Sequence, residues 1–505
     1  MLTLANSDMS ARRLITTSNC TIGAYGVLTH TDNAGAETHR LNVEVQGNLT
    51  IVAGGKIDVT GLGYDGGVGP GSPGSTSRNG GSYGGCGGYN WNNGGAYSAT
   101  YGSYLAPVNL GSGGGLWGGG GATAGGGAVK LTVSLATTLD GSILADSPAG
   151  GAYTAGGSGG SVFLTTATLT GSGTISAIGG VPTHSGAGGG GRIAVILTSG
   201  ADLGSVTVRA DGGAIGGGSD YGAGGTIYVE TNGTVSGQGQ LTVSNAYASA
   251  FVKTVTAIPA GQTWSAYNLR LLGRGVLGVV SGSTLDVKTP TAVSGTNTAG
   301  IWLNGGTFSI PAGSMEIADW SLIADGTNTL TSSNLIVRSA GILTHNPGAD
   351  DYRMVLTRNG NLTIDSGGAV SVEGKGYARG QGIGSPGTLA RSGGCYGGLG
   401  GQDGYGNPLG RTYGSYLTPT NLGSGGGNWG GGEGTAGGGA IILTVTGTTT
   451  VNGAISADAG KDSINYSAGG SGGSIHLTTA ALAGSGTIRA DGEDHTSTSA
   501  SGGGG

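Results

Sequence analysis

Two stretches of this chain, 312 residues apart, have nearly the same sequence. Residues 101–133 read YGSYLAPVNLGSGGGLWGGGGATAGGGAVKLTV, and residues 413–445 read YGSYLTPTNLGSGGGNWGGGEGTAGGGAIILTV. They agree at 26 of 33 positions. A long internal repeat of this kind is typical of proteins built from stacked copies of one structural unit.

The repeat extends on both sides of this stretch. Residues 26–30 match 341–345, 48–51 match 361–364, and 155–161 match 468–474. In the first copy, the glycines at 188–191 lead directly into the strand-like sequence RIAVIL at 192–197, and the matching glycines of the second copy are 502–505. We therefore expect about one and a half units of a longer array, with the last coils truncated.

The composition excludes several classes of protein. Glycine accounts for 119 of the 505 residues, and charged residues for only 10%. Each glycine costs a helix ~1 kcal/mol relative to alanine, so a coiled coil or a helix-rich enzyme is excluded. Collagen is excluded because the chain has 12 prolines and no strict three-residue glycine period.

The charge and the cysteines limit the partners. A net charge of −6 gives no basic field, so no nucleic-acid partner is expected. No apolar run reaches the ~18 residues of a transmembrane helix, so no membrane span is predicted. The three cysteines, at positions 20, 86 and 395, form no CxxC pair and indicate neither a disulfide framework nor a zinc site.

Short segments that alternate apolar and other residues recur along the chain, which is the pattern of strands with one buried face. Every second segment returns after about 31 to 35 residues, and no segment has a helical period with caps. We predict an all-β fold, a right-handed parallel β-helix (solenoid) with long glycine-rich insertions. The alternative is a row of tandem β-sandwich domains, which would need more hairpin signals such as Asn232-Gly233.

The predicted organisation follows the glycine content. It comprises β-helix coils at 1–59 that begin the first repeat, a glycine-rich insertion at 60–127, coils at 128–244, less glycine-rich coils at 245–353 that lead into the second repeat, coils at 354–372, a second glycine-rich insertion at 373–439, and truncated coils at 440–505.

The two insertions are too glycine-rich for ordinary turns, with 11 glycines among residues 111–127. Because their glycine spacing is reproduced in the second copy, we predict that they are ordered as polyglycine-like segments packed side by side. Aromatic residues between the glycines would clamp this layer or form its contact surface. These candidates are Tyr64, Tyr83, Tyr89, Trp91, Tyr97, Tyr101, Tyr104, Trp117, Tyr377, Tyr396, Tyr405, Tyr413, Tyr416 and Trp429.

The motifs YGSY..P.NLGSGGG, AGGGA, GGSGGS, L.GSGTI.A and GGGGRIAV follow one another in a fixed order. This series resembles the glycine-rich β-helical repeats of very large, adhesin-like surface and filament proteins of bacteria and some microbial eukaryotes. The resemblance implies an extracellular or cell-surface solenoid, and it carries over no catalytic residue.

Candidates for chemistry are few, and we predict no catalytic, cofactor or metal site. The densest acidic group is residues 491–495, and a second group, Asp350-Asp351, has no counterpart in the first copy. We interpret both groups as solvated carboxylates in turns. His30 and His345 occupy matching places and could be metal ligands, but no second histidine or cysteine lies at ligand spacing, which favours packing or capping within a turn. Residues 217–220 faintly resemble a calcium-binding turn.

These observations predict a non-catalytic structural or adhesive segment of an extracellular filament or cell-surface protein. Neighbouring copies of the chain would be its partners through self-association. The alternative is a carbohydrate-binding or carbohydrate-cleaving β-helix spike, a polysaccharide lyase or hydrolase, with surface glycans as its partners. Ice binding is a third hypothesis, although the threonines do not recur in one strict register.

Overall fold

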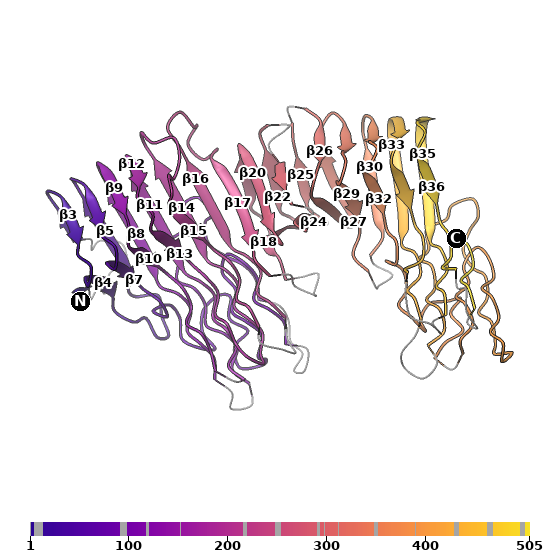
Figure 1. Ribbon diagram of the computed structural model, residues 1–505, viewed down its shortest axis with the longest axis horizontal. Coiled ribbons are helices and arrows are strands. Elements are labelled where there is room, and N and C mark those ends of the chain that lie inside the picture. The colour runs from indigo at the N-terminus through magenta and orange to yellow at the C-terminus, as the bar shows by residue number, and fades with distance from the viewer. Residues whose placement is uncertain are drawn as a thin grey trace. The chain divides into compact units, whose positions relative to one another are not determined.

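The computed structural model shows a chain of β-strands in two compact units, Met1–Gly278 and Val279–Gly505 (Figure 1). No helix occurs in the described parts of the chain, which confirms the predicted all-β class. The structure describes residues 2–4, 14–90, 98–117, 121–151, 153–215, 220–247, 254–289, 293–296, 298–311, 313–347, 352–388, 390–428, 434–461, 468–494 and 500–505.

The first unit stacks most of its strands in three sheets. One sheet has the order β1 (Leu2–Leu4), β4 (Val27–His30), β7 (Lys56–Asp58), β10 (Ser142–Leu144), β13 (Thr174–Ser176) and β15 (Thr207–Arg209). A second has β2 (Leu14–Thr16), β5 (Leu41–Val45), β8 (Ala128–Val133), β11 (Ser161–Thr166), β14 (Arg192–Leu197), β16 (Thr226–Glu230), β17 (Gln240–Asn245) and β20 (Asn268–Gly273). The third has β12 (Thr168–Thr170), β9 (Ala136–Leu139), β6 (Leu49–Ile51) and β3 (Cys20–Ile22).

Most strand pairs in the first unit are parallel and keep like residues in register. Ile57, Ile143 and Ile175 lie on three neighbouring strands as direct partners, and all three are fully buried. Parallel strands with aliphatic residues stacked in this way bury one continuous apolar core. Among the pairings described for this unit, only β16 with β17 is antiparallel. The unit also contains β18 (Thr256–Ile258) and β19 (Thr263–Ala266), and β21 (Val276–Val280) crosses its boundary.

The described residues of the second unit contain fifteen further strands. They are β22 (Thr284–Val287), β23 (Val293–Gly295), β24 (Gly300–Asn304), β25 (Thr307–Ser309), β26 (Met315–Ile317), β27 (Ser321–Thr331), β28 (Leu335–Val337), β29 (Ile342–Thr344), β30 (Met354–Arg358), β31 (Leu362–Ile364), β32 (Ala369–Ser371), β33 (Ala440–Val451), β34 (Ala454–Ser456), β35 (Ser474–Ala483) and β36 (Thr487–Arg489).

Two long strands give the second unit its final layers. β33 pairs in parallel with β30 through residues 441–445 and with β31 through residues 449–451. β35 pairs with β33 through residues 440–445 and 448–450 of β33, with a shift in register between Val445 and Thr448. β36 pairs with β34. The second unit therefore repeats the parallel stacking of the first.

Candidate functional site

In each unit, extended glycine-rich segments lie below the strands as Figure 1 is drawn. In the first unit, residues 186–191 lie among such segments and donate backbone hydrogen bonds in three directions. Residues 186 and 189 donate to the carbonyls of 78 and 81, residues 187 and 190 to those of 220 and 223, and residues 188 and 191 to those of 180 and 177. The partner changes with a period of three residues. That is the period of a polyproline II helix, whereas a strand alternates with a period of two.

Other segments donate hydrogen bonds back to the same run. The N–H groups of Gly85 and Gly88 donate to Gly190 and Ala187, and those of Gly156 and Gly159 donate to Gly186 and Gly189. The N–H of Gly213 donates to the carbonyl of Gly188. Residues 186–191 are thus bonded to six segments: 78–81, 85–88, 156–159, 177–180, 210–213 and 220–223. We call these seven segments the glycine bundle of the first unit.

The second unit contains the same kind of packing. The N–H groups of Gly423 and Gly426 donate to the carbonyls of Gly438 and Thr435, again three residues apart. The matching residues of the first unit, Gly111 and Gly114, donate to Gly126 and Thr123. Within the described residues, the glycine runs are therefore hydrogen-bonded side by side, as the sequence predicts.

Space explains why these positions are glycine. A Cβ atom at Gly188 would lie 1.7 Å from the carbonyl oxygen of Gly157, and one at Gly190 would lie 2.0 Å from that of Ala210. Any side chain would separate the backbones and break the hydrogen bonds between them. The reproduced glycine spacing is thus a packing requirement of the bundle.

Two tyrosines pack together beside the bundle of the first unit, and one of them is bonded to the second sheet. The rings of Tyr83 and Tyr101 lie 4.7 Å apart, and the Tyr83 hydroxyl is 2.7 Å from Ser161 Oγ on β11. The Tyr101 hydroxyl donates to the carbonyl of Leu110 and lies 2.8 Å from Ser112 Oγ. Burial raises the pKa of Tyr83 to about 12, so this phenol stays a neutral hydrogen-bonding group.

The second unit has the same clamp. The rings of Tyr396 and Tyr413 lie 4.8 Å apart, and the Tyr396 hydroxyl is 2.6 Å from Ser474 Oγ on β35. The Tyr413 hydroxyl lies 2.9 Å from Ser424 Oγ and donates to the carbonyl of Leu422.

A buried arginine completes the clamp of the first unit, and the sequence reasoning missed it. Arg192, at the start of β14, is fully buried, and its guanidinium lies over the rings of Tyr83 and Trp264 at 5.5 and 5.1 Å. Its Nε donates to the carbonyl of Tyr101 at 2.9 Å, and Nη1 donates to Thr226 Oγ1 at 3.2 Å. Burial lowers the pKa of Arg192 to about 10, which still leaves it charged at neutral pH. The GGGGR junction at 188–192 was the only available signal.

The other predicted aromatic residues lie in different environments. Tyr104 is 5% exposed and packs against Trp264 and Tyr228, whereas its counterpart Tyr416 is 91% exposed. Tyr64 is buried, Tyr89 and Tyr377 are half-buried, and Tyr405 is exposed. Trp117 is exposed beneath the guanidinium of Arg78. Trp91, Tyr97 and Trp429 lie outside the described residues.

The matched histidines serve as connectors between strands and insertions. The imidazole Nδ1 of His30 lies 2.7 Å from the carbonyl of Thr31, and its Nε2 accepts the N–H of Ala128 at 3.3 Å. His345 repeats this arrangement with Asn346 and Ala440. An Nε2 that accepts requires neutral imidazole, and burial lowers the pKa of His30 to about 4. Both imidazole nitrogens of each histidine are therefore engaged in contacts with the backbone.

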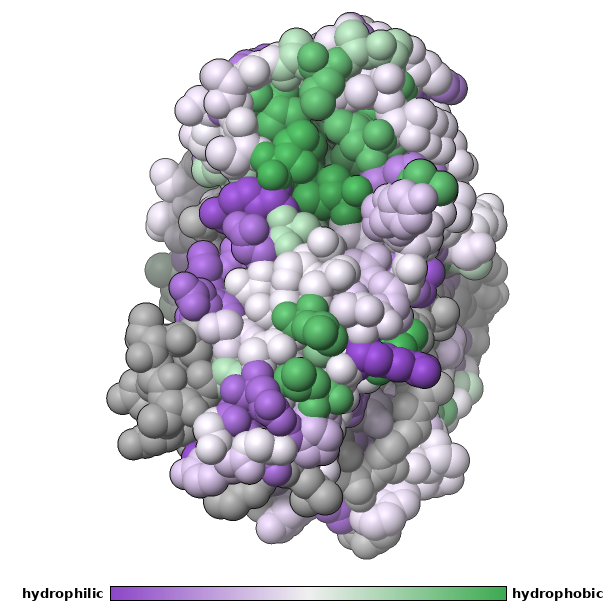
Figure 2. Space-filling model, turned by 90° about the vertical axis from the view of Figure 1, so that its right-hand side faces the viewer, coloured by the Kyte–Doolittle hydropathy of each residue, from purple (hydrophilic) through white to green (hydrophobic). Residues whose placement is uncertain are grey.

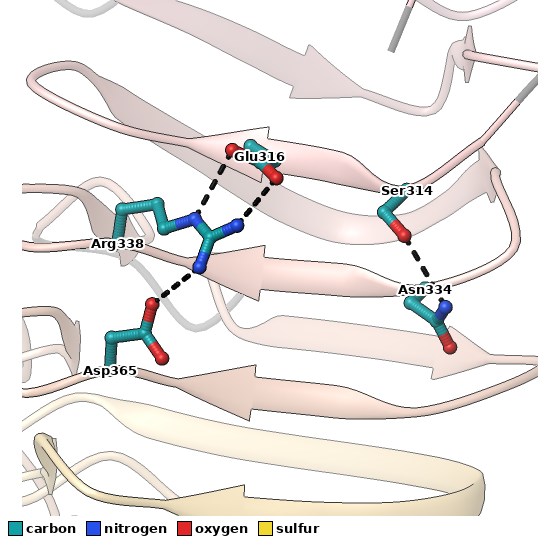
Figure 3. Close-up of polar contacts among 5 residues, drawn as sticks. All are labelled: Ser314, Glu316, Asn334, Arg338 and Asp365. Atoms are coloured by element: carbon teal, nitrogen blue, oxygen red, sulfur yellow. Dashed lines mark hydrogen bonds and ion pairs between the residues drawn. The ribbon is translucent and has the colours of Figure 1, made fainter. Parts of the chain in front are cut away.

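One charged row crosses three neighbouring strands of the second unit (Figure 3). Arg338 follows β28 and forms ion pairs with Glu316 on β26, at 2.6 Å, and with Asp365 after β31, at 2.9 Å. The sequence analysis did not identify this group, because the three residues are far apart along the chain. The two carboxylates share one guanidinium, which is the arrangement of a structural ion-pair row.

Among the described residues, no group of three or more His, Cys, Asp or Glu could hold a metal ion. Asp220 is buried, and its carboxylate accepts hydrogen bonds from Thr254 Oγ1 and the N–H of Tyr221. Residues 217–219, Asp350-Asp351 and His495, which belong to the weak candidate sites of the sequence, lie outside the described residues.

Comparisons with protein-family models, curated proteins and solved structures gave no match for this chain. No helix that could cross a bilayer occurs within the residues that the structure describes.

Proposed function

We propose that this chain is a non-catalytic structural or adhesive segment of an extracellular filament or cell-surface protein. Within the all-β class, its specific architecture would be a right-handed parallel β-helix that carries glycine bundles at a fixed pitch. Support for the fold comes from the parallel registers in which every third strand pairs, for example β7 with β10 and β10 with β13. A chain that coils around one core gives this pairing order.

The observation that carries the functional proposal is the three-residue period of hydrogen bonds in the glycine bundle. A bundle of this kind presents backbone and a few aromatic rings, and it offers few groups for acid–base or nucleophilic chemistry. It is rigid, because each run is bonded to several neighbours. Its two occurrences would form repeated lateral surfaces for self-association or partner contact.

Electron microscopy of the purified full chain tests this function. The proposal expects elongated particles that associate into filaments or lateral arrays, with a spacing set by the repeat. Monodisperse particles that stay single at high protein concentration would contradict the filament version.

A carbohydrate-active spike is the second candidate, and the row of Glu316, Arg338 and Asp365 is the observation that favours it. Carboxylates and an arginine on neighbouring strands are the groups that polysaccharide cleavage uses. Incubation with acidic polysaccharides, followed by measurement of their chain length, distinguishes the candidates. Depolymerisation that is lost in Glu316→Gln would favour this second function over the first.

A further inference from the structure

Exposed aromatic side chains gather at one end of the glycine bundle in the first unit. The guanidinium of Arg78 lies 5.3 Å from the ring of Trp117 and 5.4 Å from the ring of Tyr153. The ring of Tyr153 stacks on the imidazole of His184 at 5.3 Å. We call these four residues the aromatic cluster. Trp117 is 43% exposed, Tyr153 is 54% exposed and His184 is also exposed, so the cluster forms part of the protein surface.

The direction of the bundle segments brings the cluster together. Segments 78–81, 156–159 and 186–191 run in parallel, because the residue numbers of their hydrogen-bonded partners rise together. Three members of the cluster begin these segments or stand just before them, and they therefore meet at the same end of the bundle: Arg78, Tyr153 and His184.

The aromatic cluster differs from the apolar side chains that the strands expose. On β35 and β36 of the second unit, Leu482 and Ile488 are exposed, and Figure 2, which looks onto this end, shows apolar atoms gathered in its upper part. Their counterparts in the first unit, Leu169 and Ile175, are core residues, so that surface belongs to the strand core. The aromatic cluster lies outside the strands and is not part of such a core.

Tyr153 occupies its position against local preference. Its φ of 60° lies in the left-handed region, which costs free energy for any residue other than glycine. Residues 146–152 differ from residues 459–465 of the second copy at every position, and yet Tyr153 is matched by Tyr466. The arginine and the tryptophan of the cluster recur as well, at positions 391 and 429. Exposed side chains that recur where their neighbours do not, one of them on a strained backbone, indicate binding more than packing.

The polar atoms of the cluster indicate an acidic ligand. Arg78 donates from Nε to the carbonyl of Trp117 at 3.4 Å, whereas its two Nη groups donate to no residue that the structure describes. The indole N–H of Trp117 and the hydroxyl of Tyr153 also make no hydrogen bond to a described residue. A guanidinium with two unused Nη groups can hold a carboxylate through two parallel hydrogen bonds.

The exposed rings beside this arginine favour a saccharide as the carrier of the carboxylate. The C–H groups of a pyranose ring pack against the faces of indole and phenol rings, which are apolar surfaces with a polar group at one edge. Sugar hydroxyls can bond to the phenol hydroxyl of Tyr153 and to the imidazole of His184, since both groups can donate or accept. A uronic acid combines the pyranose ring and the carboxylate in one residue.

We propose that the aromatic cluster binds an acidic saccharide. The carboxylate of a uronic acid bonds to the Nη groups of Arg78, and its pyranose ring packs against Trp117 and Tyr153. No bond of the saccharide is broken, so the site serves adhesion. Because the same residue types recur in the second copy, an array of repeats would hold a long polysaccharide at several points. This inference deepens the proposed function, on which it rests for the adhesive role.

Isothermal titration calorimetry of the full chain with tri-galacturonic acid tests the site. The matched control probe is the same trisaccharide with its carboxylates converted to methyl esters, which keeps the rings and removes the charge. We expect saturable binding of the acid and at least about tenfold weaker binding of the ester, because hydrogen bonds to a charged group are the strong ones. A hyaluronan hexasaccharide extends the test to a second uronic acid.

The variant Tyr153→Gly separates binding from folding. Glycine adopts a φ of 60° without strain, so the thermal unfolding midpoint should not fall, whereas loss of the ring should weaken binding of the saccharide about threefold to tenfold. Arg78→Lys keeps the charge but loses the paired hydrogen bonds, and should weaken binding about tenfold. Tyr25→Ala is the matched control: it removes a tyrosine of the first unit that is 98% exposed and outside the cluster, and should leave binding unchanged.

The proposal is overturned if the acid and the methyl ester bind equally, if neither acidic saccharide binds, or if Tyr153→Gly keeps full affinity. Self-association that is lost in Arg78→Lys while no saccharide binds would make a second copy of the chain the ligand, and would also overturn it. The two proposals can fail separately. Filaments without saccharide binding leave the proposed function standing, and saccharide binding by particles that stay single leaves the site without the filament.

Discussion

The two copies of the glycine-rich repeat build the same clamp, but only the first is covered by later strands. Tyr104 is 5% exposed and Tyr416 is 91% exposed, although the sequence around both reads YGSYL. In the first unit, the Tyr104 hydroxyl accepts from the N–H of Ser265 at 2.8 Å and donates to its carbonyl at 2.7 Å. The comparison shows that later strands decide which aromatic residues of the first copy are buried.

The largest effect should come from the buried tyrosine. Tyr104→Ala removes a ring packed on Trp264 and leaves the backbone of Ser265 without its hydrogen-bond partner, so we expect a loss of about 3 to 5 kcal/mol from the first unit. Hydrogen exchange of intact protein, followed by mass spectrometry, measures this loss for each unit separately. Tyr416→Ala should change the stability of the second unit by less than about 0.5 kcal/mol. Similar losses for both variants would show that the two tyrosines are equally covered.

A second pair of substitutions compares matched glycines. Gly190→Ala places a methyl group 2.0 Å from the carbonyl oxygen of Ala210, whereas the added carbon at Gly504 meets nothing within 4 Å. We expect Gly190→Ala to destabilise the first unit by about 3 kcal/mol, and Gly504→Ala to be nearly neutral. Denaturant unfolding followed by tryptophan fluorescence and circular dichroism measures both. An equally tolerated Gly190→Ala would contradict tight packing of the bundle.

The matched histidines should make the chain sensitive to acid. Burial lowers the pKa of His30 to about 4 from the ordinary 6.5, and lowers that of His345 as well. The unfolded chain then binds more protons between these values, so stability is complete above pH 6.5 and falls as the pH drops toward 4. For His30 the loss amounts to about 3 kcal/mol. Unfolding free energies measured from pH 7.5 to pH 4 should show this slope.

The variant His30→Gln serves as the control for the acid effect. Its amide can donate and accept in place of the imidazole but cannot gain a proton in this range. The slope between pH 6.5 and pH 4 should therefore become smaller in the variant. An unchanged slope would assign the acid sensitivity to carboxylates instead of His30.

The smallest effect should come from a feature that the copies do not share. The first copy has Gly23 and Val52 where the second has Arg338 and Asp365. The Arg338 side chain is 42% exposed, so Arg338→Met should cost the second unit less than about 1 kcal/mol, and less still in high salt. A larger loss, measured by the same unfolding experiment, would mean that this ion-pair row holds the strands together.

Much of the fold could be predicted from local patterns. The alternating segments, such as Ile193/Val195/Leu197 in β14, lie in strands because alternation requires only that one face be buried. Packing of the glycine runs was predictable because the spacing is reproduced in a second copy. The hydrogen-bond period of three was not, because an unbroken run of glycine carries no periodic pattern of side chains.

The candidate site was predictable only in part. Tyr83 and Tyr396 were among the fourteen aromatic residues predicted either to clamp the glycine layer or to form its contact surface. Arg192, whose guanidinium lies over the rings of Tyr83 and Trp264, was not predicted. An arginine at the start of a strand is usually a surface residue, and its burial depends on Trp264, which follows 72 residues later in the chain. Sequence spacing gives no indication of a contact between such distant residues.

The sequence by itself determined the all-β class, the repeat and the places where only glycine fits, because these follow from side-chain size and from local alternation. The tertiary structure decided that the YGSYL segment of the first unit lies in the core, because burial is set by what packs on top of a residue. In the first unit, Arg192, Tyr228 and Trp264 supply that cover. In the second unit, the same tyrosines frame an open groove.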